Sequence, residues 1–139
     1  GWFGGENPFD MDAKKLSLSQ TAAKYTQSTL SYISAVGLEA ALGEILMIGT
    51  DKINKHSQNL ANLLITGLSN LEWAPFCHAN AKEASSHIIT LSAPESNIPF
   101  AVERLNKNRI ICGVRNNRIR VSIAHYNNSH DINALLQSL

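Results

Sequence analysis

A pair of asparagines, Asn116-Asn117, separates two runs rich in β-branched residues: Arg109-Ile-Ile-Cys-Gly-Val-Arg115 and Arg118-Ile-Arg-Val-Ser-Ile123. Because asparagine tolerates positive φ angles, this pattern predicts two strands joined by a two-residue β-hairpin. Successive side chains of a strand point to opposite faces, so Arg118 and Arg120 are expected on one face of the second strand.

Three further elements are expected around this hairpin. The segment His87-Ile-Ile-Thr-Leu-Ser92 is rich in β-branched residues and predicts a strand. A short helix is expected after it, with Pro99 in the first turn and three side chains facing inward: Phe100, Val102 and Leu105. A terminal helix is expected from about Ser129, because Asn128 and Asp131 have the spacing of a capping box; its inward residues are Ile132, Leu135 and Leu136.

Two longer helices are predicted earlier in the chain. Between Ile33 and Met47, apolar residues recur at three- and four-residue steps, which is typical of a largely buried helix with Ser31 as its N-cap. A second helix is expected from an N-cap at Thr50 to about Leu68. One side of that helix is expected to face the core, through Ile53, Leu60, Leu63, Leu64 and Leu68.

The order of these elements predicts the fold class. It is two helices, a strand, a helix, two strands and a helix, which indicates an α+β fold with a small, three- to four-stranded and mostly antiparallel sheet covered by helices. Residues 1–30 combine glycines and a proline with bulky aromatic side chains. They are expected to form an extended segment ahead of a domain that spans residues 31–139.

The composition argues against a disordered chain and against two kinds of binding partner. It has 139 residues, 44% hydrophobic and 17% charged, which suits one globular domain and is too apolar for disorder. A net charge of +1 gives no electrostatic reason to expect nucleic acid or an anionic membrane surface. The longest apolar stretch, residues 35–48, is interrupted by two glutamates and is shorter than the ~20 residues that span a bilayer. Neither nucleic acid nor a membrane is therefore an expected partner.

No self-contained catalytic or metal site is recognisable. The two cysteines, Cys77 and Cys112, lack CxxC or zinc spacing, which favours a reducing compartment, and Cys112 is expected to be a small buried hydrophobic residue. The five histidines lack the HxH and HExxH spacings of metal sites. There is also no nucleophile elbow, P-loop or dinucleotide-binding fingerprint.

The candidate ligand-binding residues lie at the hairpin and directly after it. Arg118 and Arg120 are suited to bind a carboxylate or phosphate bidentately, and the alternative interpretation is a solvated edge strand protected by its charge. His125 and Tyr126 precede a helix N-terminus, where ligand-facing groups are common. A tyrosine at this place also commonly serves as a lid over the core.

Four motifs together resemble one known family. They are Gly1-Trp2-Phe3, Asn7-Pro8-Phe9-Asp10, Tyr25-Thr26-Gln27-Ser28-Thr29 leading into Val36-Gly37-Leu38-Glu39-Ala40-Ala41-Leu42, and Arg118-Ile-Arg-Val-Ser-Ile-Ala-His-Tyr-Asn127. In this combination the chain resembles the class V aminotransferases. These are fold-type I pyridoxal-phosphate (PLP) enzymes that include cysteine desulfurases, selenocysteine lyases and isopenicillin N epimerase-like proteins. The run from Arg120 to Asn127 is the most specific part of the resemblance.

The resemblance implies roles for individual residues. It implies that the chain is the C-terminal part of a larger PLP enzyme and begins after the lysine that holds the cofactor, so no catalytic residue is expected in this chain. Arg120 is expected to bind the α-carboxylate of an amino-acid substrate. Thr29, with Ser28 where the family usually has glycine, is expected to bind the PLP phosphate of the neighbouring subunit in a cytoplasmic homodimer.

The hairpin turn bears on the type of reaction. Desulfurases of the family carry a nucleophilic cysteine on a longer loop between the last two strands, whereas this chain has only Asn116-Asn117 there. The resemblance therefore favours an aminotransferase, epimerase or lyase. The alternative function is a stand-alone α+β module that binds a small molecule or a protein without catalysis.

Overall fold

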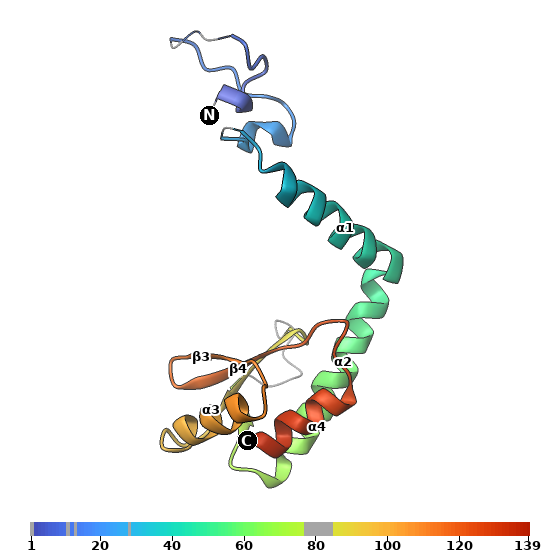
Figure 1. Ribbon diagram of the computed structural model, residues 1–139, viewed down its shortest axis with the longest axis vertical. Helices are drawn as coiled ribbons and strands as arrows, with labels where there is room; N and C mark the ends of the chain where they lie inside the picture. Colours follow the sequence, from blue (N-terminus) through green and yellow to red (C-terminus); the bar gives the residue numbers. More distant parts are fainter. Residues whose placement is uncertain (1, 11, 13, 28, 77–84) are drawn as a thin grey trace. The chain divides into compact units, whose positions relative to one another are not determined.

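The computed structural model describes residues 2–10, 12, 14–27, 29–76 and 85–139 (Figure 1). The chain divides into two compact units, which we call the N-terminal unit (residues 1–47) and the C-terminal unit (residues 48–139). The predicted boundary between residues 30 and 31 stays a prediction.

The N-terminal unit begins with two 3-10 helices, η1 (Trp2–Gly4) and η2 (Ala22–Tyr25), and an isolated antiparallel bridge between Gly5 and Leu18. Gly4 is buried where these pieces meet. A Cβ atom at this position would lie 2.8 Å from the carbonyl oxygen of Lys24, so the close approach requires glycine.

The helix α1 (Tyr32–Ile48) follows, and the prediction that it is largely buried is wrong. None of its residues is buried, and large apolar side chains such as Ile33 and Leu46 are 85% and 74% exposed. Its apolar residues lie on every side of the helix rather than on one face. Such a sequence requires cover all round, and the described residues of the chain do not supply it.

The C-terminal unit contains a four-stranded sheet formed by β1 (Ala74–Pro75), β2 (Ile88–Ser92), β3 (Gly113–Arg115) and β4 (Arg118–Ser122). The strand order is β1-β2-β4-β3 and every pair is antiparallel. This arrangement confirms the predicted α+β class and the antiparallel sheet. Asn116 and Asn117 have φ angles of 50° and 51°, so they form the predicted two-residue turn between β3 and β4.

The strand before this turn is shorter than predicted. It begins at Gly113 instead of Arg109, whose φ is 58°. The backbone N–H of Ile110 donates to the carbonyl of Leu105 at 2.8 Å, and Ile111 is 99% exposed. Residues 109–112 therefore connect the preceding helix to the sheet, because the backbone of Ile110 is hydrogen-bonded to the end of that helix.

The helices α2 (Thr50–Gly67), α3 (Asn97–Lys107) and α4 (Ser129–Ser138) cover one face of the sheet, and a short 3-10 helix, η3 (Leu68–Asn70), extends α2. Alternate residues of β2 and β4 meet the apolar faces of these helices in one core. Its buried members from the two strands and the three helices are Ile89, Leu91, Ile119, Val121, Leu60, Ala61, Leu64, Ile98, Ala101, Leu105, Ile132 and Leu135. No helix among the described residues of the C-terminal unit covers the opposite face of the sheet (Figure 1).

The helix termini agree only partly with the predictions. Asn128 and Asp131 form the predicted capping box of α4. At α2, however, Thr50 is the first helical residue, and the N-cap is Gly49, which has a φ of 93° and no side chain to accept a hydrogen bond. Phe100 of α3 is 64% exposed instead of inward, because the buried positions of this helix are one turn apart at Ile98, Ala101 and Leu105.

No single helix among the described residues is long and apolar enough to cross a membrane. The consecutive helical segments Tyr32–Ile48 and Thr50–Asn70 meet that criterion only as an interrupted pair, by length and composition alone.

Candidate functional site

The helix-free side of the sheet carries the predicted arginines. Eight residues on this side make up what we name the outer sheet face. One row across the strands contains Ala74, Ser92, Arg118 and Arg115, and the next contains Phe76, Thr90, Arg120 and Gly113. Residues directly opposite each other on neighbouring strands share a face, so the two rows form one continuous surface.

The position of β4 decides between the two interpretations of its arginines. Arg118 and Arg120 do lie on one face, and the residues between and after them, Ile119 and Val121, are buried. β4 lies between β2 and β3, so it is an inner strand. The interpretation as a charged edge strand is therefore wrong for β4. It applies only to Arg115 on the edge strand β3.

Arg120 stands between two small neighbours. It is opposite Thr90 of β2 on one side and opposite Gly113 of β3 on the other. A Cβ atom at position 113 would lie 3.8 Å from the Cβ of Arg120, so the glycine leaves the space beside the arginine open. Within the described part of the chain, the Arg120 guanidinium forms no hydrogen bond or ion pair, which leaves its five donors available.

Arg118 is held in a different way. Its guanidinium carbon lies 3.9 Å from the centre of the Phe76 ring, a cation–π contact. Phe76 follows β1, and its backbone N–H donates to Thr90 at 2.8 Å. Since β2 lies between β1 and β4, the Arg118 side chain must extend across the outer side of β2.

One polar atom of this face has no hydrogen-bond partner among the described residues. The hydroxyl oxygen of Ser92 is shielded from solvent and forms no hydrogen bond with any described residue. Ser92 opposes Arg118 one step beyond the pair of Leu91 and Ile119. A buried polar group without a protein partner is rare in folded proteins, and ordered water commonly satisfies such a group.

The residues after β4 have structural roles. Asn127 accepts a hydrogen bond from the backbone of Ala124 at 2.9 Å and donates one to the Asp131 carboxylate at 3.2 Å. The carbonyl of Asn127 accepts a hydrogen bond from Nε2 of His56 on α2 at 2.8 Å. The asparagine of the motif therefore fastens the end of β4 to both α4 and α2.

Asp131 completes this fastening. Its carboxylate accepts hydrogen bonds from the backbone N–H of Asn128 at 3.0 Å and from the Asn127 amide. The Asn128 hydrogen bond first, and the Asn127 hydrogen bond second, lower the pKa of this carboxyl below its ordinary value of 3.8. The side chain is exposed, so this effect is a modest contribution to the cap.

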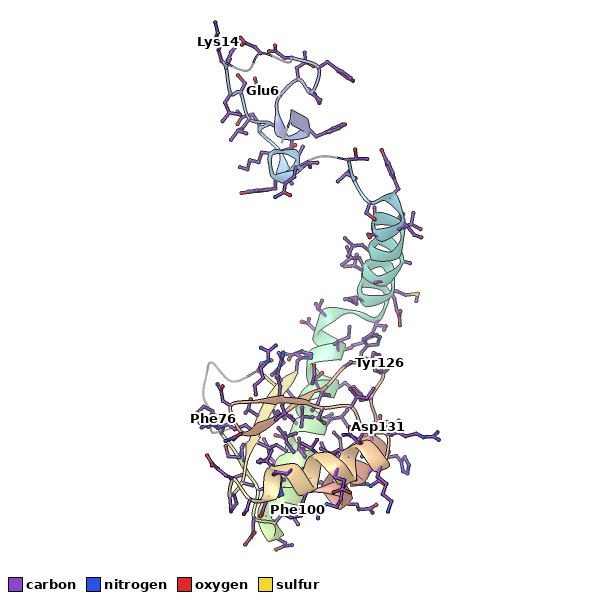
Figure 2. All side chains as sticks on the ribbon, turned by 60° about the vertical axis from the view of Figure 1, so that its left-hand side comes forward. Glu6, Lys14, Phe76, Phe100, Tyr126 and Asp131 are labelled. Carbon is purple, nitrogen blue, oxygen red and sulfur yellow. The ribbon has the colours of Figure 1, made fainter. Side chains whose placement is uncertain are left out.

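Tyr126 does not cover the core. It is 76% exposed, and its ring meets that of His125 edge-on, with 5.3 Å between ring centres and 74° between ring planes. The expectation of a core lid is wrong here. Figure 2 shows Tyr126 and Phe76 at separate places of the C-terminal unit, so the aromatic ring that accompanies the arginines is Phe76.

The residues predicted to bind the cofactor phosphate lie in the other unit. Thr29 precedes α1 and is exposed. Ser28 lies outside the described residues. The described lysines, Lys14, Lys15, Lys24, Lys52, Lys55 and Lys107, are all exposed, and Lys82 lies outside the described residues.

Cys112 behaves as predicted for a small hydrophobic residue. It is half-buried and packs against the core, and burial raises the pKa of its thiol. A raised pKa keeps the thiol protonated and unreactive. Cys77 lies outside the described residues, among which no group of three or more His, Cys, Asp or Glu side chains is placed to hold a metal ion.

Two features of the C-terminal unit had no signal in the sequence. The fully buried hydroxyl of Ser57 on α2 hydrogen-bonds Nδ1 of His87 at 3.0 Å, which ties that helix to the start of β2. A cavity of about 400 Å³ is lined by residues that include Trp73, Phe100 and Arg104, and by none of the outer sheet face. Both depend on contacts between segments that are distant in the sequence.

Comparison with known proteins agrees with this architecture. The fold is similar to that of a solved structure of the cysteine desulfurase CsdA from Escherichia coli, with a TM-score of 0.73 and 19% sequence identity. The match covers 93% of this chain and 35% of that protein, so this chain spans about a third of the length of CsdA. At this identity the likeness concerns the fold alone.

The family follows from the sequence itself. Residues 2–135 match the model of the family described as aminotransferase class-V. The chain therefore belongs to the class V aminotransferase family, which confirms the resemblance drawn from its motifs. No curated protein matches the chain.

Proposed function

We propose that this chain is part of a PLP-dependent enzyme that acts on an amino acid, and that Arg120 binds the substrate's α-carboxylate. The observation that carries this proposal is the setting of Arg120. It lies on an inner strand, between Thr90 and Gly113, with a guanidinium that has no partner among the described residues.

The chemistry of the guanidinium suits this task. Its planar fork matches both oxygens of a carboxylate, and two parallel hydrogen bonds fix the orientation as well as the position of the bound group. An amino acid held in this way presents one bond of its α-carbon in a constant direction, which is how a binding residue contributes to rate. PLP, when bound, supplies an electron sink for negative charge at that carbon.

The chain supplies some of the groups that a PLP enzyme needs. The hydroxyl of Thr29 is exposed and is a suitable donor to a phosphate oxygen, so we assign it, with Ser28, to the PLP phosphate of the neighbouring subunit in a homodimer. The six described lysines are all solvent-exposed, whereas a lysine that forms a Schiff base works in a shielded site. In this proposal, the cofactor lysine belongs to the large domain of the enzyme, as the family resemblance implies.

Replacement of Arg120 tests the binding role. In the complete enzyme, Arg120→Ala should raise the KM for the amino-acid substrate by roughly 10- to 150-fold, because charge-assisted hydrogen bonds contribute about 1.5–3 kcal/mol. Steady-state kinetics measures this change. Lys107→Gln is the control, since it removes one positive charge from an exposed position on α3. An Arg120→Ala enzyme with the KM of the parent would remove Arg120 from the substrate site.

Chemical labelling tests the position of the cofactor lysine. When the chain of residues 1–139 is incubated with PLP and reduced with borohydride, we expect low labelling spread over several exposed lysines. Intact-mass measurement and peptide mapping give the extent and the sites. Stoichiometric labelling of a single lysine would show that the Schiff-base lysine lies within this chain.

A further inference from the structure

The charge on the outer sheet face exceeds what one carboxylate requires. Arg115 and Arg118 are directly opposite each other on β3 and β4, and Arg120 follows on the same face of β4. Like charges at directly opposed positions disfavour the sheet. No acidic residue belongs to this face, and within the described ranges none of the three arginines forms an ion pair.

An acidic residue, Glu95, does contact the hairpin, but at its turn. It accepts a hydrogen bond from the Asn117 side chain at 3.3 Å and forms no ion pair with a described arginine. The arrangement is therefore one of unpaired donors, and it suits a ligand that brings more than one negative charge.

The position of Arg118 leaves its donors available to a second anionic group. The contact with Phe76 keeps its guanidinium across β2 and leaves the guanidinium edges, with their N–H donors, available. Thr90 lies between Phe76 and Arg120 in the same row, so the two cationic side chains flank the exposed side of β2.

We propose that Arg118, supported by Arg115, binds a second acidic group of the substrate, so that the substrate is a dicarboxylic amino acid. This inference rests on the proposed function, in which Arg120 binds the α-carboxylate. Arg118 thereby acts as a specificity residue, and Phe76 positions it.

L-Glutamate and L-glutamine test this proposal, because they have nearly the same shape and differ in the charge of the side chain. Their dissociation constants are measured on the full chain of residues 1–139 by NMR, with the Nε–H signals of the arginines as the readout. We expect glutamate to bind at least about tenfold more tightly than glutamine, and to shift the signals of both Arg118 and Arg120. Glutamine should shift that of Arg120 alone.

Variants separate the two roles. Arg118→Gln should bring the two dissociation constants to within about twofold of each other and leave glutamine binding unchanged. Phe76→Leu keeps the charge but removes the ring, and should reduce the preference for glutamate by a smaller factor. Lys107→Gln, which removes a charge from α3, should preserve the preference.

The possible outcomes distinguish this inference from the proposed function. A preference for glutamate that survives Arg118→Gln, or its absence in the parent chain, overturns the second anionic subsite and leaves Arg120 in place. Sulfate that binds as tightly as glutamate shows a general anion site and also overturns it. If Arg120→Gln leaves glutamine binding unchanged, the proposed role of Arg120 fails instead.

Discussion

The helices α1 and α2 are neighbours in the sequence, but they differ in how many of their side chains are buried. α1 is the more apolar of the two and has no buried residue, whereas α2 is largely polar and buries Ser57, Leu60, Ala61 and Leu64. The difference lies in arrangement: α2 gathers its apolar residues on one face that meets the sheet, and α1 distributes them on all sides. Apolar content alone therefore does not determine burial, because a covering element must also exist.

Truncation of one leucine in each helix gives the largest expected contrast. Leu64→Ala on α2 removes a fully buried side chain and should lower the free energy of unfolding by about 2–5 kcal/mol. Leu46→Ala on α1, at a position that is 74% exposed, should change it by less than ~0.5 kcal/mol. Urea unfolding at equal protein concentration measures both. Equal losses would show that α1 is covered in solution.

The helix N-termini offer a second contrast of intermediate size. The Asn128 side chain accepts hydrogen bonds from two backbone N–H groups of α4, so Asn128→Ala should cost about 1 kcal/mol. Ser31 precedes α1, but its hydroxyl bonds the side chain of Ser34, and Ser31→Ala should cost less than ~0.5 kcal/mol. Thermal unfolding followed by circular dichroism compares the two. A larger loss for Ser31→Ala would mean that its hydroxyl caps α1.

The smallest expected effect is a pH dependence at the capping box of α4. Hydrogen bonds from Asn128 and Asn127 lower the pKa of Asp131 in the folded chain, so the carboxylate stabilises the fold above its ordinary pKa of 3.8. This stabilisation is lost as the pH falls through the lower pKa of the folded state. The difference in unfolding free energy between the parent and Asp131→Asn should be constant near neutral pH and shrink below pH 3.8. A difference that grows on acidification would contradict this assignment.

The features that could be predicted from the sequence are those that depend on a few adjacent residues. The turn at Asn116-Asn117 follows from the tolerance of asparagine for positive φ, and the cap at Asn128 and Asp131 follows from their spacing. The common face of Arg118 and Arg120 follows in the same way from strand alternation.

The features that could not be predicted depend on distant segments. An inner position for β4 requires its pairing with β2, and the stack of Arg118 on Phe76 requires β1 as well. Phe100 is expected to face inward, but the side of α3 that meets the core is set by the sheet and carries Ile98, Ala101 and Leu105. The burial of α1 cannot be predicted from α1 itself. Its apolar sequence indicates that the helix should be covered, but it does not identify the element that covers it.

The strand order has a consequence for folding. β3 and β4 are joined by two residues, and such a hairpin forms within about 1–10 μs, whereas β2 pairs with β4 only after the chain between them, α3 included, has closed into a loop. Arg120 therefore acquires its neighbour Gly113 early and its neighbour Thr90 late. The outer sheet face is therefore complete only when the slower, non-local pairing between β2 and β4 has formed.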